Sequence, residues 1–328
     1  MTNELLSSVA GYRIQKTLKS PVTLKGIGLH TGRPAEVQIF PAQPNEGLQF
    51  EKTVGGKTYR VPAHFESVVS TTLATSLGIA GIEDSKISTV EHLMSALYAM
   101  GVTNALIRME GPEVPILDGS SAPFVEALLE TGLAAQPFTA NALKILKPIK
   151  IYQQGAICEL LPRDSLRLTT SVDFPHPMIG TQIFALELSP KSFKDIISNA
   201  RTFGFYNDLQ KLQSHGLALG ASLENAVGFT EDGVLNTDGL RYPDECVRHK
   251  LLDALGDLAL CGSWIQGELV SFRGGHSIHL ALLKSLAAHP THWELLPSEP
   301  ISGLSGEHLR EGHKKSYSSL SEISSKSL

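Results

Sequence analysis

Alternating hydrophobic and polar residues open the first half of the chain, a pattern that predicts short strands. The alternation runs through PVTLKGIGLHTG (21–32) and RPAEVQIFPA (33–42), and Gly55 with Gly56 predicts a tight turn between further strands. The segment NALIRMEG (104–111) reads as a buried strand. We therefore expect these segments to form a sheet.

Two segments of the first half have a helical period. In the first, the capping candidates are Ser88 and Thr89, Gly101 is the stop, and an apolar stripe is formed by Val90, Leu93, Leu97 and Met100. A second helix is predicted over 120–132, with Gly132 as its stop. The proline-containing stretch 134–148 is expected to link the two halves.

The second half begins with predicted strands over 149–162 and 166–174. A helix-like insertion is expected around 192–205 and 209–216. The remaining elements follow in the order helix 241–262, strand 266–272, Gly-Gly turn and helix 277–289. From about Pro290 the pattern decays, and the Ser-rich end 316–328 predicts a mobile tail.

The two halves resemble each other in the order of these elements. EHLMSALYAMG, ALIRM and PILDGSSAPFVEALL parallel RHKLLDALGDLALCG, ELVSF and RGGHSIHLALLKSL. This repetition predicts a duplicated α/β layer. His92 and His249 fall near the start of corresponding helices, so we expect them to meet across a pseudo-twofold interface, where ligand sites often form.

Composition narrows the class of protein. Of 328 residues, 42% are hydrophobic and 19% charged, which is typical of a globular protein with room for two domains. A net charge of −5 disfavours nucleic-acid binding. The absence of a long apolar run or an apolar leader predicts no membrane span, stable membrane anchor or signal peptide. The cysteines are too scattered for a disulfide framework, which predicts a reducing cytoplasm: Cys158, Cys246 and Cys261.

One pair of residues indicates chemistry. His249 and Asp253 lie four residues apart on a predicted helix, and therefore on one face of it, with Asp257 one turn further along. His92 is the best candidate for a third metal ligand, and Glu91 precedes it. Two histidines and one aspartate leave zinc an open position for water, and a neighbouring glutamate can act as base. This set predicts a hydrolase.

Plainer interpretations exist for each residue. A His/Asp pair on a helix is more often a surface hydrogen bond, and an acid such as Glu91 in a first turn favours the helix dipole in any case. His92 at a helix start can simply face solvent. No HExxH motif occurs. The metal interpretation gains support from a set of leucines that predicts a buried helix, in which charge needs a partner or a metal: Leu251, Leu252, Leu255 and Leu258.

His276 follows a strand and a Gly-Gly turn in FRGGHSIH (272–279). It is either a surface residue that caps a helix or a general acid whose charged form is favoured by Asp257. Gly26 and Gly28 in KGIGLHTG hint at a phosphate loop, but the spacing is wrong and a strand follows, so we reject a dinucleotide site. No GxSxG motif is present.

Seven segments over about residues 11–290 form a combination that is highly specific: KGIGLHTG, STVEHLMSAL, PILDGSSAPFVEAL, ARTFGF, GLALGASLENAV, GLRYPDECVRHKLLDALGDLALCG and FRGGHSIH. In these segments, and in their order, the chain resembles the UDP-3-O-acyl-N-acetylglucosamine deacetylases, the zinc amidases of lipid A biosynthesis in Gram-negative bacteria.

The resemblance implies zinc bound by His92, His249 and Asp253. It implies Glu91 as general base and His276 as general acid, oriented by Asp257. Thr202 would be the hydroxyl that stabilises the oxyanion, with Phe203 as its neighbour. The other implied substrate contacts are Lys250 to the sugar or diphosphate, Asp173 and Phe174 near the uridine, and Arg273 near the phosphates.

The resemblance also implies the fold and the reaction. We expect an α+β protein of two similar two-layer α/β domains, each a β-α-α-β sandwich, packed face to face with a small insertion in each. The expected ranges are 1–140, 141–295 with an acyl-chain passage near 201–227, and a tail over 296–328. The expected substrate is an acylated UDP-amino sugar that loses acetate, and the expected assembly is a monomer.

Two alternatives stay open on the sequence alone. The first is a zinc amidase that acts on another acylated sugar or amino compound, against which the long acyl-binding insertion argues. The second is a protein without catalysis in which the same His/Asp set is structural. Structural zinc is usually closed by four protein ligands, often including cysteine, whereas here acid and base residues crowd the set.

Overall fold

A five-stranded sheet is built from the first half of the chain. The structure, a computed structural model, describes residues 14–301. In the order in which they pair, the strands of the sheet are β2 (Val22–Ile27), β3 (Pro34–Pro41), β9 (Ala105–Glu110), β4 (Leu48–Val54) and β5 (Lys57–Pro62). Alternation explains β3, in which Ala35, Val37 and Ile39 are buried. The predicted turn at Gly55 and Gly56 is confirmed, and both glycines have positive φ.

A seven-stranded sheet is built from the second half and the segment before it. Its main path is β12-β13-β18-β11-β19, and β14 pairs with both β18 and β15. The strands of the main path are β12 (Ile149–Gln153), β13 (Ala156–Leu161), β18 (Trp264–Phe272), β11 (Ala142–Ile145) and β19 (Trp293–Leu296). The other two strands are β14 (Leu166–Phe174) and β15 (Gly180–Glu187).

Strand pairing follows the same pattern in both sheets. In the first, β2-β3 and β3-β9 are antiparallel, β9-β4 is parallel and β4-β5 is antiparallel. In the second, β12-β13 and β13-β18 are antiparallel, β18-β14 is parallel and β14-β15 is antiparallel. The protein is thus a mixed α and β structure in which one pairing order occurs twice.

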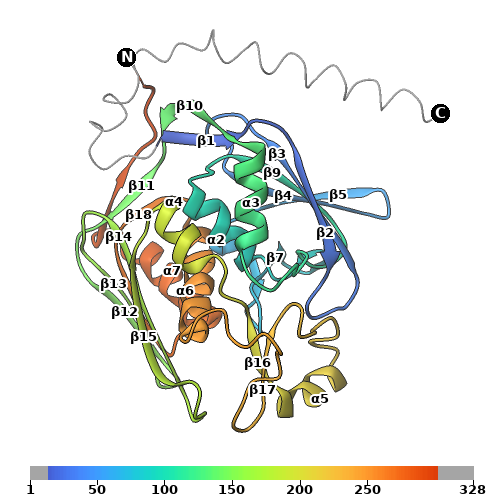
Figure 1. Ribbon diagram of the computed structural model, residues 1–328. Coiled ribbons are helices and arrows are strands. Elements are labelled where there is room, and N and C mark those ends of the chain that lie inside the picture. The colour runs from blue at the N-terminus through green and yellow to red at the C-terminus, as the bar shows by residue number, and fades with distance from the viewer. Residues whose placement is uncertain (1–13, 302–328) are drawn as a thin grey trace, which may run out of the picture.

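Helices fill the space between the two sheets (Figure 1). They are α2 (Glu91–Met100) and α3 (Ala122–Thr131) from the first half, and α6 (Glu245–Leu258) and α7 (His276–Ala288) from the second. α2 packs directly on α6. Leu93 and Leu97 of α2 and Leu251 and Leu255 of α6 are fully buried in one hydrophobic cluster. Burial of both helices explains why polar side chains on their facing surfaces need partners.

Smaller elements surround this core. β6 (Val68–Ser70), β7 (Ser76–Ile79) and β8 (Ile82–Ile87) form a three-stranded sheet. β16 (Phe203–Phe205) pairs with β17 (Val227–Phe229), and α5 (Tyr206–Ser214) lies beside them (Figure 1). Short turns of helix occur at Phe65–Ser67, Pro190–Ser192, Phe193–Ile197 and Ala259–Cys261. Among residues 14–301, none of the helices has the length and apolarity needed to span a membrane.

Two expectations about strands were wrong. The stretch 134–148 is not a plain link, because it forms most of β10 (Leu133–Thr139) and all of β11. β10 pairs with β1 (Ile14–Leu18). The pattern beyond Pro290 does not simply decay, since β19 pairs with β11. Part of the predicted tail, 302–328, lies outside the described residues.

The predicted cap of the first helix was also wrong. Val90 is the N-cap of α2 and makes no capping bond through its side chain. The Ser88 hydroxyl bonds instead to Ser76, and the Thr89 hydroxyl donates to Glu113. The predicted stop is confirmed: Gly101 has φ 78° and its N–H bonds to carbonyls of the last turn.

Candidate active site

The crossing of α2 and α6 builds the site. A Cβ on Gly256 would lie 2.1 Å from the carbonyl oxygen of Glu91, so only glycine allows the start of α2 to lie this close to α6. The contact brings Glu91 and His92 beside Asp253 and Asp257. The sequence expectation that His92 and His249 meet between the two halves is confirmed, with ring centroids 5.0 Å apart.

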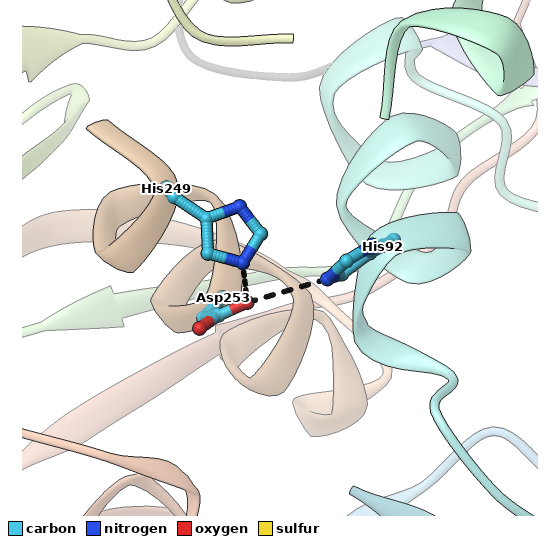
Figure 2. Close-up of side chains that lie close together, drawn as sticks. All are labelled: His92, His249 and Asp253. Carbon is cyan, nitrogen blue, oxygen red and sulfur yellow. Dashed lines mark ion pairs between the residues drawn. The ribbon is translucent and has the colours of Figure 1, made fainter. Parts of the chain in front are cut away.

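Three side chains converge in a way that fits a metal ion. His249 Nε2 lies 3.3 Å and His92 Nε2 3.7 Å from Asp253 Oδ1. Figure 2 shows both imidazoles turned toward this carboxylate. The three candidate ligand atoms all lie within 4.8 Å of one another. Ligands at 2.0–2.1 Å from a tetrahedral zinc ion are roughly 3.3 Å apart. All three residues are buried, and among residues 14–301 no other group of this kind occurs.

Neighbouring groups orient these side chains. His249 Nδ1 donates to the carbonyl of Ala200 at 3.0 Å, which leaves Nε2 with a lone pair that faces the site. The ammonium of Lys250 donates to Asp253 Oδ2 at 2.9 Å, so Oδ1 is the oxygen turned toward the histidines. His92 Nδ1 is buried and has no hydrogen-bond partner within the described part of the chain.

The protonation of the three residues suits metal binding. Burial, reinforced by the His249 imidazole, lowers the pKa of His92 to about 3. Burial also lowers the pKa of His249. Burial alone would raise the pKa of Asp253, but His249 and Lys250 lower it overall. At neutral pH the set is two neutral imidazoles and one carboxylate, the donor forms that zinc requires.

Glu91 lies beside this set as a carboxyl group suited to proton transfer. Its Oε2 accepts the backbone N–H of Thr75 at 3.1 Å, and its Oε1 lies 3.5 Å from His276 Nε2. Burial raises the pKa of Glu91 to about 7. A group with this pKa exchanges a proton readily at neutral pH.

His276 is the first residue of α7 and is paired with Asp257. Its Nδ1 lies 2.8 Å from Asp257 Oδ2. Burial alone would lower the pKa of His276, but the carboxylates of Asp257 and Glu91 raise it to about 10. The interpretation of His276 as a surface cap is therefore wrong: the side chain is buried, ion-paired and cationic at neutral pH.

A cavity of about 350 Å³ opens onto these groups. The sequence-predicted residues that line it are Glu91, His92, Thr202, Phe203, His249, Lys250, Asp253 and His276. Thr202 is held from both sides of its backbone, by Gly119 and Val227, at 2.8 Å each. Asp257 lies behind His276, outside the lining.

The three remaining predicted residues, Asp173, Phe174 and Arg273, also lie outside this lining. Asp173 and Arg273 face one another at 3.7 Å, and both side chains are roughly half exposed. Phe174 packs edge-on against Phe203 of the lining, with ring centroids 5.6 Å apart. Phe174 lines a separate cavity of about 450 Å³ with other aromatic residues, among them His176, Phe205 and Phe229.

A third, mostly apolar cavity of about 330 Å³ adjoins the cavity that contains Glu91 and His276. The two share Leu29, His30, Leu73, Thr202 and Phe203. The rest of its wall comes from the insertion that carries β16, α5 and β17, and includes Leu209, Leu212, Leu223 and Leu235.

Comparison with known proteins decides the family. The family model for UDP-3-O-acyl N-acetylglycosamine deacetylase matches residues 15–288. The chain belongs to this family. The resemblance drawn from the sequence motifs is confirmed.

Curated relatives in this deacetylase family cover nearly the same length. A UDP-3-O-acyl-N-acetylglucosamine deacetylase of Syntrophotalea carbinolica is 43% identical over 284 residues, 87% of this chain and 91% of the relative. Its counterpart in Myxococcus xanthus is 40% identical, with 87% and 90% covered. That of Brucella melitensis biotype 2 is 42% identical, with 86% and 98% covered.

Three residues of the site were missed in the sequence analysis. Thr75 contacts both Glu91 and Asp257, and His279 shares Asp257 with His276. The spacing of His279, three residues after His276 on a helix, could have placed the two on one face. His30 lines both cavities, and its buried Nε2 is unpaired among residues 14–301.

Proposed function

We propose that this protein hydrolyses the N-acetyl group of UDP-3-O-(3-hydroxyacyl)-N-acetylglucosamine. The products would be acetate and UDP-3-O-(3-hydroxyacyl)-glucosamine, and the reaction would be the committed step of lipid A biosynthesis. The observation that carries the proposal is the buried His92–His249–Asp253 set, which opens into the same cavity as Glu91 and His276. Membership of a family of deacetylases supports it.

We propose zinc as the cofactor, held by His92 Nε2, His249 Nε2 and Asp253 Oδ1. Three protein ligands leave a position open, which is the arrangement of catalytic rather than structural zinc. When bound, zinc supplies Lewis acidity toward a carbonyl oxygen and lowers the pKa of water. Because two neutral imidazoles and a carboxylate offer lone pairs without first losing a proton, the site is prepared for a cation at neutral pH.

The protein's own groups would move two protons. Glu91 in its carboxylate form would take a proton from the attacking water as the new C–O bond forms at the acetyl carbon. His276 in its cationic form would give a proton to the amide nitrogen as the C–N bond breaks. The separation of 3.5 Å between Glu91 Oε1 and His276 Nε2 lets the proton return from one to the other after turnover.

Two lining residues would stabilise the tetrahedral intermediate and the substrate. The Thr202 hydroxyl would donate to the oxyanion, a contribution typically worth about 3 kcal/mol. The fixed backbone of Thr202 supports this role. Lys250, whose ammonium lies 2.9 Å from Asp253, would contact the sugar or the diphosphate and keep Asp253 ionised. Asp257 would orient His276 through the 2.8 Å hydrogen bond to its Nδ1.

The cavities supply regions for the remaining substrate groups. The apolar cavity beside Phe203 suits the 3-hydroxyacyl chain, because leucine and alanine make up half of the residues in its wall. The aromatic cavity at Phe174 suits the uracil ring, which stacks favourably on aromatic faces. Asp173 and Arg273 would then contact the ribose and the phosphates. This arrangement favours an acylated UDP-amino sugar over an unrelated amide.

We also propose that the two halves, residues 1–140 and 141–295, arose by duplication of a β-α-α-β unit. The two units would pack face to face, and the protein would be a monomer. The repeated strand-pairing order supports this. The insertions would be the β6-β7-β8 sheet in the first unit and the segment 201–227 in the second. Three free, buried cysteines support a reducing cytoplasm as the compartment.

The test is release of acetate from the purified substrate after chelation and again after addition of stoichiometric zinc. We expect activity to be lost and then restored, and UDP-N-acetylglucosamine without the acyl chain to be a poor substrate. The Glu91→Gln variant is the matched control for contaminating activity. No release with zinc restored would exclude this substrate, and equal release from unrelated acetylated amino sugars would favour a broader amidase.

A further inference from the structure

Asp257 accepts hydrogen bonds from three different residues. Nδ1 of His276 and Nδ1 of His279 both lie 2.8 Å from the same oxygen, Oδ2. The hydroxyl of Thr75 donates to the other oxygen, Oδ1, at 2.6 Å. All four residues are buried. One carboxylate is therefore fixed by two imidazoles and one hydroxyl.

The chemistry of the partners assigns the protons. Burial alone would raise the pKa of Asp257, but His276 and the hydrogen bonds from both histidines lower it, so the group is an ionised acceptor. Nδ1 of His279 must then carry a hydrogen. Its Nε2 lies 2.9 Å from the hydroxyl of Ser271, which can donate to it. Each ring nitrogen of His279 thus has a hydrogen-bond partner.

The local backbone leaves room for this second histidine. A Cβ on Gly274 would lie 2.0 Å from Ser271 Oγ and 3.0 Å from His279 Nε2. Gly275, by contrast, has nothing within 4 Å of its Cβ position. The first glycine of the Gly-Gly turn therefore accommodates the Ser271–His279 pair, and α7 then presents His276 and His279 to Asp257 one turn apart.

We propose that His279 is a positioning residue that acts on His276 through Asp257. A carboxylate that is hydrogen-bonded at one oxygen can rotate about its Cβ–Cγ bond. Hydrogen-bond donors at both oxygens, two of them from successive turns of one helix, restrict the carboxylate to one orientation. His279 and Thr75 hold Asp257 in that orientation, and Oδ2 then lies in line with His276 Nδ1–H. The consequence for catalysis rests on the proposed function, while the coupling of His279 to His276 does not.

The first test measures the coupling without substrate. In the full-length protein as purified, with ¹⁵N-labelled histidine, we expect His279→Leu to shift and broaden the Nδ1–H signal of His276. His279→Asn keeps an N–H donor near the position of Nδ1 and should restore the wild-type signal. Ser271→Ala, which removes only the outer hydrogen bond, should shift the signal less and carries the test if the Leu variant does not fold. An unchanged His276 signal in these variants would overturn the proposal.

The second test is a double-mutant cycle on deacetylation. We expect His279→Leu to lower kcat about tenfold, as loss of an orienting partner commonly does, with KM unchanged and His279→Asn close to wild type. In an Asp257→Ala background the same substitution should cost less than about twofold, because the group that transmits its effect is gone. Effects that multiply would mean that His279 acts independently of Asp257. Absence of activity in the wild type would refute the proposed substrate and leave the NMR result decisive.

Discussion

At the scale of single residues, the site raises the pKa of two neighbouring groups for different physical reasons. Glu91 has a pKa raised to about 7 because it is buried, and His276 has a pKa raised to about 10 because two carboxylates outweigh its burial. The two atoms that face one another are 3.5 Å apart. One group can therefore accept a proton at the pH at which the other can give one.

The proposed role of Glu91 as a base predicts that metal binding and turnover can be separated by mutation. Glu91→Gln keeps the size of the side chain and its position next to Thr75 but removes the basic oxygen. We expect kcat to fall by roughly 10²–10⁴. Metal content, measured by atomic absorption, should stay at the wild-type level because Glu91 is not among the three converging ligand atoms. A variant that keeps near wild-type turnover would refute this role.

The pKa values of the pair predict a bell-shaped pH profile. Activity should rise as Glu91 loses its proton near pH 7, since only the carboxylate can accept one. It should fall as His276 loses its proton near pH 10, since only the cation can donate. The measurement is kcat/KM from pH 5 to 11, and the acidic limb should disappear in Glu91→Gln. A profile that is flat through this range would contradict the pairing.

At the scale of elements, the site depends on how closely α2 and α6 pack. Gly256 is an interior helical residue, where alanine is ordinarily more stable by up to about 1 kcal/mol. Here a Cβ would clash with backbone, 2.1 Å from the Glu91 carbonyl oxygen, and backbone cannot move aside as a flexible side chain can. The glycine therefore serves the crossing of the helices rather than either helix alone.

This clash predicts a destabilised protein. In Gly256→Ala we expect the free energy of unfolding to fall by about 1–3 kcal/mol, as in other overpacked cores, despite the gain in helix propensity. Zinc affinity should fall as well, because the start of α2 carries His92. Denaturant unfolding and metal titration are the measurements. Gly204→Ala is the matched control, since nothing lies within 4 Å of that Cβ position, and it should unfold like the wild type.

Helices and strands were predictable from the sequence where the local residue pattern and the tertiary packing favour the same structure. Gly101 gave the end of α2, the apolar period gave its start to within two residues, and alternation gave β3. Strands whose formation depends on a distant partner strand were not predicted from the sequence. β10 is a short strand that pairs with β1, and β11 is a short strand that lies between β18 and β19 and pairs with both. No local sequence pattern indicates partners that lie so far away along the chain. Ser88 and Thr89 resemble caps, but their hydroxyls meet Ser76 and Glu113 instead.

The same distinction holds for the candidate site. His249 and Asp253 were predictable from their spacing on one helix, and the motifs brought in His92 from another element. Thr75 and His279 were not, because their relevance lies in contacts with Asp257 that span 182 and 22 residues of sequence. Lys250 and Asp253 lie three residues apart on α6, a spacing from which their pairing could also have been predicted.

At the scale of the whole molecule, the three converging side chains connect the two halves of the chain. His92 comes from α2, and His249 and Asp253 come from α6, and the two helices share one hydrophobic cluster between the two sheets. A cation at this point would bind the folded protein and not the unfolded chain, because the three residues converge only when both halves are packed. Metal binding should therefore contribute to global stability as well as to catalysis.

Removal of the proposed zinc ion should therefore lower the thermal stability of the whole protein. Ligand binding to the folded state alone contributes about 4 kcal/mol when free zinc is about 1,000 times its Kd. We expect chelation to lower Tm by several degrees, and zinc to restore it, as followed by calorimetry. Asp253→Ala is the matched control, because with one ligand removed its Tm should no longer depend on zinc. If chelation leaves the wild-type Tm unchanged while zinc is shown to have been removed, the three residues do not hold the two halves together through a metal.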